Sequence, residues 1–103
     1  MELLYKVEGT ILYKDSAEEV EKFIEVLRET EKVHAKLITK TEEQETCKFG
    51  IQFSFYKKAK DGFASDFLVL LRSGKRFDSG EIFFADSYHG EQRLIVSSGE
   101  WFF

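Results

Sequence analysis

The segment SAEEVEKFIEVLRETEK, residues 16–32, indicates the fold more clearly than any other part of the chain. Its apolar side chains recur at the helical spacing of about 3.6 residues and form one stripe, made of Val20, Phe23, Ile24 and Leu27. Ser16 followed by Glu19 has the pattern of a capping box, in which each side chain binds a free backbone amide. Acidic residues fill the first turn and basic residues the last, which suits the helix dipole. We therefore predict a helix over residues 16–31.

Strands with one apolar face surround this helix in the sequence. Residues 3–13 alternate apolar and polar side chains, and Gly9 interrupts them where a bulge or a close backbone approach is expected. A second alternating segment, residues 33–37, is expected to pair with residues 47–56 as a hairpin. The inward side of residues 47–56 is predicted to consist of Cys47, Phe49, Ile51, Phe53 and Phe55.

The C-terminal half contains one ambiguous segment and one further hairpin. Residues 63–72 fit a helical stripe, but Phe67–Leu71 also fits a short central strand. The short length and the glycine-containing turns on both sides favour the strand, although the helix stays open. Residues 81–86 and 92–97 are predicted to pair through the turn at 87–90.

These elements predict an α+β fold in one domain, residues 1–103, with a single helix packed on a bent antiparallel sheet. The expected order is β-α-β-β-β-β-β, with residues 63–72 as strand or helix. Eleven phenylalanines, four tyrosines and one tryptophan supply bulky side chains for a thin core. The order is similar to that of cystatin-like domains, in which a sheet wraps one helix. This similarity is topological and implies no function, because no binding motif of that family is present.

Composition narrows the class of protein. With 43% hydrophobic and 33% charged residues, the chain is typical of a folded domain rather than of a disordered or membrane-spanning one. One cysteine excludes an internal disulfide and a multi-cysteine zinc site, and the N-terminus lacks the layout of a secretion signal. We therefore expect a cytoplasmic protein that has no membrane association, no metal and no cofactor.

Acidic residues concentrate in residues 15–32, which hold seven acids and three bases. Exposed carboxylates on a helix attract a partner with a basic surface, although an ordinary solvated helix face has the same composition. The expected partner-binding residues are Glu18, Glu21, Glu25 and Glu29 on the helix and Glu42, Glu43 and Glu45 in the hairpin loop. This is the strongest partner signal in the chain.

Two other groups of residues are candidates for function. The chain ends in Trp101, Phe102 and Phe103, which are expected to dock as a last strand or, alternatively, to form a homodimer contact. A carboxylate, a phenol and an imidazole, the groups used in acid–base catalysis, meet in one hairpin at Asp86, Tyr88 and His89. The alternative for this hairpin is a plain turn.

Nucleic-acid binding is not favoured. Basic and aromatic side chains do lie close together in the sequence, at Lys48, Tyr56, Lys57, Lys58 and Lys60. However, strand alternation puts the phenylalanines on the side opposite Lys48 and Lys58. The net charge of −4 also opposes binding to phosphates.

We therefore predict a non-enzymatic, acidic protein-binding module that recognises another protein with a basic surface. Its size and charge are similar to those of inhibitor or immunity-type proteins, such as those by which phages and mobile elements block host defence. Two alternatives remain open: a small-ligand or acid–base enzyme domain that uses Asp86, Tyr88 and His89, and a nucleic-acid-binding sheet domain.

Overall fold

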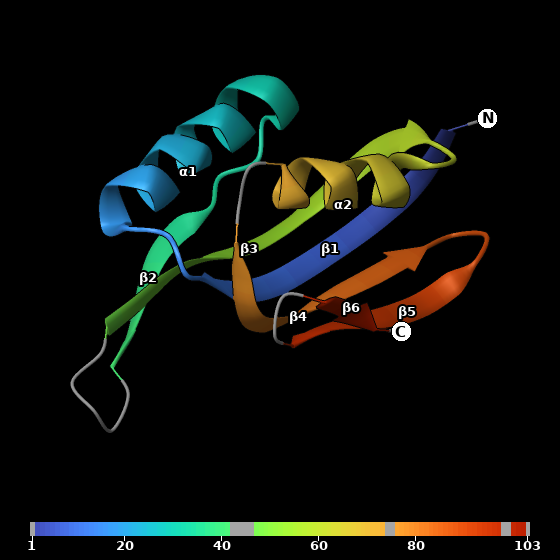
Figure 1. Ribbon diagram of the computed structural model, residues 1–103. Helices are drawn as coiled ribbons and strands as arrows, with labels where there is room; N and C mark the ends of the chain where they lie inside the picture. The colour runs from blue at the N-terminus through green and yellow to red at the C-terminus, as the bar shows by residue number, and fades with distance from the viewer. Residues whose placement is uncertain (1, 42–46, 74–75, 98–99, 103) are drawn as a thin grey trace.

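The computed structural model describes residues 2–41, 47–73, 76–97 and 100–102, which form two helices on one face of an antiparallel sheet (Figure 1). The elements follow one another as β1 (Glu2–Tyr13), α1 (Ala17–Glu31), β2 (Lys36–Thr41), β3 (Cys47–Lys60), α2 (Phe63–Arg72), β4 (Phe77–Asp86), β5 (Gly90–Ser97) and β6 (Glu100–Phe102). The predicted class, an α+β fold with a helix packed on an antiparallel sheet, is confirmed.

The predicted helix start is also confirmed. The Oγ atom of Ser16 accepts a hydrogen bond from the backbone amide of Glu19 at 3.3 Å. The helix ends at Glu31, and the next residue, Lys32, caps it in a left-handed conformation with φ 58°. Val20, Phe23 and Leu27 are buried, so the apolar stripe faces the sheet.

Residues 63–72 form α2, so the preference for a strand there was wrong. The buried side chains of this segment are Phe63, Phe67 and Leu71, which recur every four residues and share one helix face. A strand from Phe67 to Leu71 would instead have buried Val69 beside Phe67, and Val69 is 68% exposed. The sheet therefore carries two helices where one was expected, which also separates the fold from the single-helix, cystatin-like order.

The strand order is β2-β3-β1-β4-β5-β6, with β1 between β3 and β4. The units β1-α1-β2 and β3-α2-β4 each join two parallel strands that are separated by one strand of the other unit. Two interleaved split β-α-β units of this kind form the arrangement known as ferredoxin-like, which β5 and β6 extend beyond β4. Because a fold of this kind supports many functions, topology alone assigns none.

The core lies between the helices and the sheet and is rich in aromatic rings. One cluster, with ring centroids 5.5 to 6.4 Å apart, consists of Phe53, Phe55, Phe63 and Phe67. Cys47, which was expected to point inward with this series, is exposed at the start of β3 instead. Both helices cover the same face, so the described part of the chain places no helix on the opposite face of the sheet (Figure 1).

Candidate functional site

α1 carries a net charge equal to that of the whole protein. The helix holds six acidic and two basic residues, leaving thirteen of each elsewhere in the chain. The four acids predicted for partner binding are all exposed and lie on one face at helical spacing: Glu18, Glu21, Glu25 and Glu29. Sequence periodicity alone located this face, because a helix fixes the relative directions of its side chains.

Two carboxylates on this face already have basic neighbours within the helix. Glu18 lies 3.5 Å from Lys22, and Glu25 lies 3.0 Å from Arg28. Such exposed pairs typically contribute between 0 and about 1 kcal/mol. Among the described residues, Glu21 is found in no ion pair.

The remaining predicted contact residues fall partly outside the described part of the chain. Glu42, Glu43, Glu45 and Phe103 belong to the ranges that the structure does not describe. Trp101 and Phe102 lie in β6, whose backbone pairs with β5 at Val96 and Ile95. The prediction of a last strand is thus confirmed, and self-association through these aromatic residues stays a prediction.

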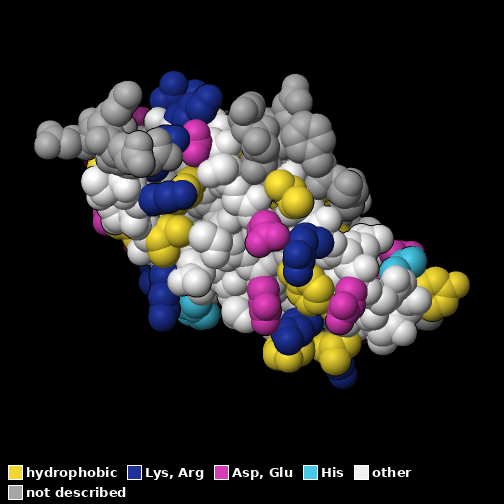
Figure 2. Space-filling model, turned by 90° about the horizontal axis from the view of Figure 1, so that it is seen from below, with side chains coloured by type: hydrophobic (Ala, Val, Ile, Leu, Met, Phe, Trp, Pro, Cys, Tyr) yellow, Lys and Arg dark blue, Asp and Glu magenta, His cyan; other side chains and the backbone are white. Residues whose placement is uncertain are grey.

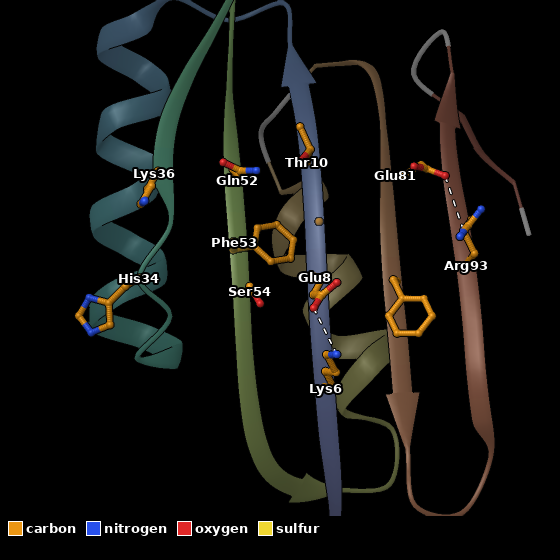
Figure 3. A pocket seen from close by; sticks show the side chains of 12 residues that line it. Lys6, Glu8, Thr10, His34, Lys36, Gln52, Phe53, Ser54, Glu81 and Arg93 are labelled. Carbon is orange, nitrogen blue, oxygen red and sulfur yellow. Dashed lines mark ion pairs between the residues drawn. The ribbon is translucent and has the colours of Figure 1, made fainter.

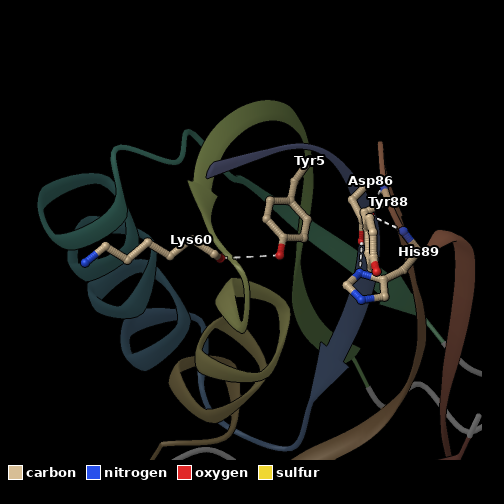
Figure 4. Close-up of polar contacts among 5 residues, drawn as sticks. All are labelled: Tyr5, Lys60, Asp86, Tyr88 and His89. Atoms are coloured by element: carbon tan, nitrogen blue, oxygen red, sulfur yellow. Dashed lines mark hydrogen bonds and ion pairs between the residues drawn. The ribbon is translucent and has the colours of Figure 1, made fainter. Parts of the chain in front are cut away.

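The candidate acid–base residues meet at the turn between β4 and β5 (Figure 4). One carboxylate oxygen of Asp86, Oδ1, accepts hydrogen bonds from the backbone amides of Tyr88, at 2.7 Å, and His89. The other, Oδ2, lies 3.1 Å from Nδ1 of His89. Gly90 then continues the turn with a positive φ of 78°. These contacts are the ones that hold a tight turn, and Tyr88 is 71% exposed.

The electrostatics of this hairpin follow from the same contacts. Desolvation acts to raise the pKa of Asp86, but the hydrogen bonds from His89 and Tyr88 outweigh it and hold that pKa below its ordinary value. Burial, followed by the nearby carboxylates of Asp61 and Asp86, raises the pKa of Tyr5. The Tyr5 hydroxyl donates to the carbonyl of Lys60 at 3.4 Å (Figure 4). The ligand-binding hypothesis for Asp86, Tyr88 and His89 stays a prediction.

We expect Asp86→Ala to lower the free energy of unfolding by about 1 kcal/mol at pH 7, because the turn loses its hydrogen-bond acceptor. The folded-state pKa of Asp86 is depressed, so the carboxylate stabilises the fold above its unfolded pKa. That contribution is lost as the pH falls through the folded-state pKa. Urea unfolding at a series of pH values should therefore show that the free energies of unfolding of the wild type and Asp86→Ala become equal in acid. A difference between them that does not change with pH would contradict this role of the Asp86 carboxylate.

The open face of the sheet contains a hollow of about 830 Å³. Figure 3 shows its lining side chains, which come from β1 to β5 and from the segment before β2. The lining residues that β1, β4 and β5 contribute include Lys6, Glu8, Glu81, Phe83 and Arg93. Figure 2 shows basic, acidic and hydrophobic side chains side by side on this face. None of Asp86, Tyr88 and His89 lines the hollow.

Sequence reasoning missed this surface. Outward residues of a strand look like ordinary solvated positions until strand pairing is known. The rows that these residues form depend on the register between β1, β4 and β5, which are far apart in the sequence. Within β4 itself, the outward-facing Phe83 beside the outward-facing Glu81 is the local feature that could have indicated this surface.

One of the lysines considered for nucleic-acid binding, Lys57, lies apart from the others. The ammonium group of Lys57 lies 2.7 Å from a carboxylate oxygen of Glu31 and 5.0 Å from the ring centre of Phe63. It therefore bridges α1 and α2 on the helical side. Lys58, the next residue of the strand, alternates to the other face. Lys60 and Tyr56 are exposed on the same face as Lys58, and the nucleic-acid alternative stays a prediction.

Comparisons with known proteins identify no relative: no family model, curated protein or solved structure matches the chain. Neither helix in the described part is long and apolar enough to cross a membrane. Within residues 2–41, 47–73, 76–97 and 100–102, no three or more His, Cys, Asp or Glu side chains are grouped as a metal ion would require.

Proposed function

We propose that this protein is a non-enzymatic binding module that uses the exposed acidic face of α1 to bind a protein with a basic surface. The observation that carries the proposal is the position of the charge. The net charge of α1 is −4, equal to that of the whole chain, because the remaining residues contain thirteen acids and thirteen bases. A field concentrated on one helix steers a basic partner to that helix and increases the rate of association.

The helix is also suited to present this face. Val20, Phe23 and Leu27 anchor it to the sheet, so its outer residues are held on a rigid support. Val26 is 44% exposed beside the acidic residues and offers apolar area to the centre of an interface. A basic protein surface that ordinarily binds nucleic acid is the partner class that matches such a row of carboxylates. A protein that occupies such a surface acts as an inhibitor, which is the role we propose.

The experiment compares two charge-reversed variants in affinity capture from a lysate of the source cell, with mass spectrometry of the eluate. Glu21→Lys/Glu29→Lys reverses two exposed acids on α1 without removing either of the intrahelical ion pairs. Glu2→Lys/Asp61→Lys makes the same change in net charge at exposed positions off the helix. We expect the wild type and the second variant to capture one protein in stoichiometric amount and the first variant to lose it.

The captured protein should then bind the purified wild type with an affinity that falls as salt is added, because salt screens exposed charges. A nucleic-acid oligonucleotide should compete with this binding. Equal capture by the two variants, or no stoichiometric capture by the wild type, would count against the proposal. Circular dichroism of each variant verifies that the fold is retained.

A further inference from the structure

Three neighbouring strands arrange charged and apolar side chains in rows across the open face of the sheet. The antiparallel registers of β1 with β4, and of β4 with β5, place directly opposed residues on the same face. Two adjacent rows result, Glu8–Phe83–Arg93 and Lys6–Ala85–Glu91. In each row an apolar side chain of β4 stands between two charges of opposite sign. The signs are reversed from the first row to the second.

This pattern is complementary to itself. If a second copy of the sheet is turned by a half rotation about an axis along β4, its β5 comes to lie over β1 and its β1 over β5. Each Glu8 then faces an Arg93, each Lys6 faces a Glu91, and Phe83 faces its own counterpart. We propose that the open face is the docking surface for a second copy of this chain, in a two-fold dimer whose axis follows β4.

The side chains in these rows are available for such contacts. Within the chain, Glu8 forms an exposed ion pair with Lys6 at 3.5 Å, and Arg93 forms one with Glu81 at 3.6 Å. Because surface pairs of this kind are weak, their members can exchange partners with little loss of free energy. The dimer places a further opposite charge beside Glu8 and beside Arg93.

Exposed apolar side chains on the same face supply the hydrophobic part of the interface. Leu4 is 48% exposed and Tyr56 is 68% exposed, and both lie on the Lys6 side of the sheet. Ile95, 47% exposed, is opposite Glu81 on the same face. These side chains lie outside the two charged rows and add apolar area to that of Phe83 and Ala85 at the axis.

The dimensions of the molecule permit this arrangement. It measures 47 × 28 × 20 Å, so its broad faces are on the order of 1,000 Å², whereas a stable interface buries roughly 800 Å² per partner. Two twisted sheets pack face to face at about 10 Å with their strands nearly aligned. The two Phe83 rings and the long charged side chains would fill the facing hollows. Both α1 helices would remain on the outside, free for the partner proposed above.

One contact in the dimer is unfavourable and gives the proposal a distinctive test. Glu81 lies on β4, in the row next to Phe83, so two Glu81 carboxylates approach each other across the axis. Arg93 of the same chain, 3.6 Å away, only partly neutralises each of them. Replacing Glu81 by glutamine should therefore tighten the dimer severalfold.

The experiment measures the association constant by sedimentation velocity from micromolar to near-millimolar concentrations. The wild type should change with concentration from the 12.0 kDa monomer to twice that mass. Glu8→Arg and Arg93→Glu should each weaken the dimer at least about tenfold, because each brings like charges together. The double variant Glu8→Arg/Arg93→Glu should return to within about threefold of the wild type, because it restores opposite charges across the interface.

Controls separate this result from a loss of folding and from the function proposed for α1. Arg28→Glu makes the same change of charge as Arg93→Glu on the helical side and should leave the dimer unchanged. The independent pair Lys6→Glu and Glu91→Lys repeats the swap in the second row if a variant of the first row fails to fold. A wild type that stays monomeric, a dimer that survives both single reversals, or double variants that remain monomeric would overturn the proposal.

Discussion

Replacement of Phe67 by alanine is expected to lower the free energy of unfolding by about 4 kcal/mol, the typical loss for a buried phenylalanine. Phe67 is 1% exposed. Its ring centre lies 5.5 Å from those of Phe53 and Phe55 and 5.6 Å from that of Phe63. Truncation removes the centre of this cluster and leaves a cavity that three rigid rings cannot close. Urea unfolding at pH 7, monitored by circular dichroism, measures the loss.

Val69→Ala is the matched control for this prediction, because it also truncates an apolar side chain of α2. Val69 is 68% exposed, so its replacement should change stability by no more than about 0.5 kcal/mol. In a strand, Phe67 and Val69 would point to the same side, and both replacements would be strongly destabilising. Similar losses for the two variants would therefore contradict the helix itself.

The difference between α1 and α2 shows which parts of this fold are encoded locally. For α1, the cap at Ser16, the apolar stripe and the charge gradient lie within one segment and agree with one another. In α2, Gly62 offers no side-chain cap, and the apolar run Phe67–Leu71 fits two periodicities. Only the tertiary contacts of Phe63 and Phe67 with the rings of β3 decide between helix and strand.

The candidate surfaces divide in the same way. Glu18, Glu21, Glu25 and Glu29 could be placed on one face from helical spacing alone. The row Glu8–Phe83–Arg93 could not, because it depends on two strand registers between segments distant in the chain. Gly9 was expected to mark a bulge or a close backbone approach, but the register of β1 is regular there and the nearest group is the side-chain ring of Phe53. At Gly50 the close neighbour is the main chain of β1, and the alternation of residues 47–56 did not indicate this contact.

Gly50→Ala is expected to destabilise the protein by about 3 kcal/mol, the upper part of the range for forced overpacking. A Cβ atom at Gly50 would lie 2.1 Å from the carbonyl oxygen of Ile11 and 2.9 Å from Cα of Leu12. Both atoms belong to the main chain of β1. Unlike the end of a flexible side chain, they cannot move aside without opening the hydrogen bonds between β1 and β3.

β1 also has no room to retreat on its other side. There a Cβ atom at Gly80 of β4 would lie 2.3 Å from the carbonyl oxygen of Thr10. The backbone of β1 therefore lies close to a glycine of each neighbouring strand. If β1 moved away from residue 50 of β3, it would come closer to β4. We therefore expect Gly50→Ala to disturb both ladders of β1, which amide hydrogen exchange along β1 would detect as faster exchange.

Gly62→Ala separates this steric effect from the backbone preference of glycine. No atom lies within 4 Å of a Cβ built at Gly62, but its φ of 99° is unfavourable for alanine, so the expected loss is about 1 kcal/mol. Denaturant unfolding of Gly50→Ala and Gly62→Ala therefore compares the stability lost through a steric clash between strands with the stability lost through backbone strain at a turn. If Gly50→Ala were no more destabilising than Gly62→Ala, the close passage of β3 against β1 could not be a determinant of the sheet. A larger loss of stability for Gly50→Ala would show that the close contact between β3 and β1 helps to hold β1 in its place beside β4 and β5.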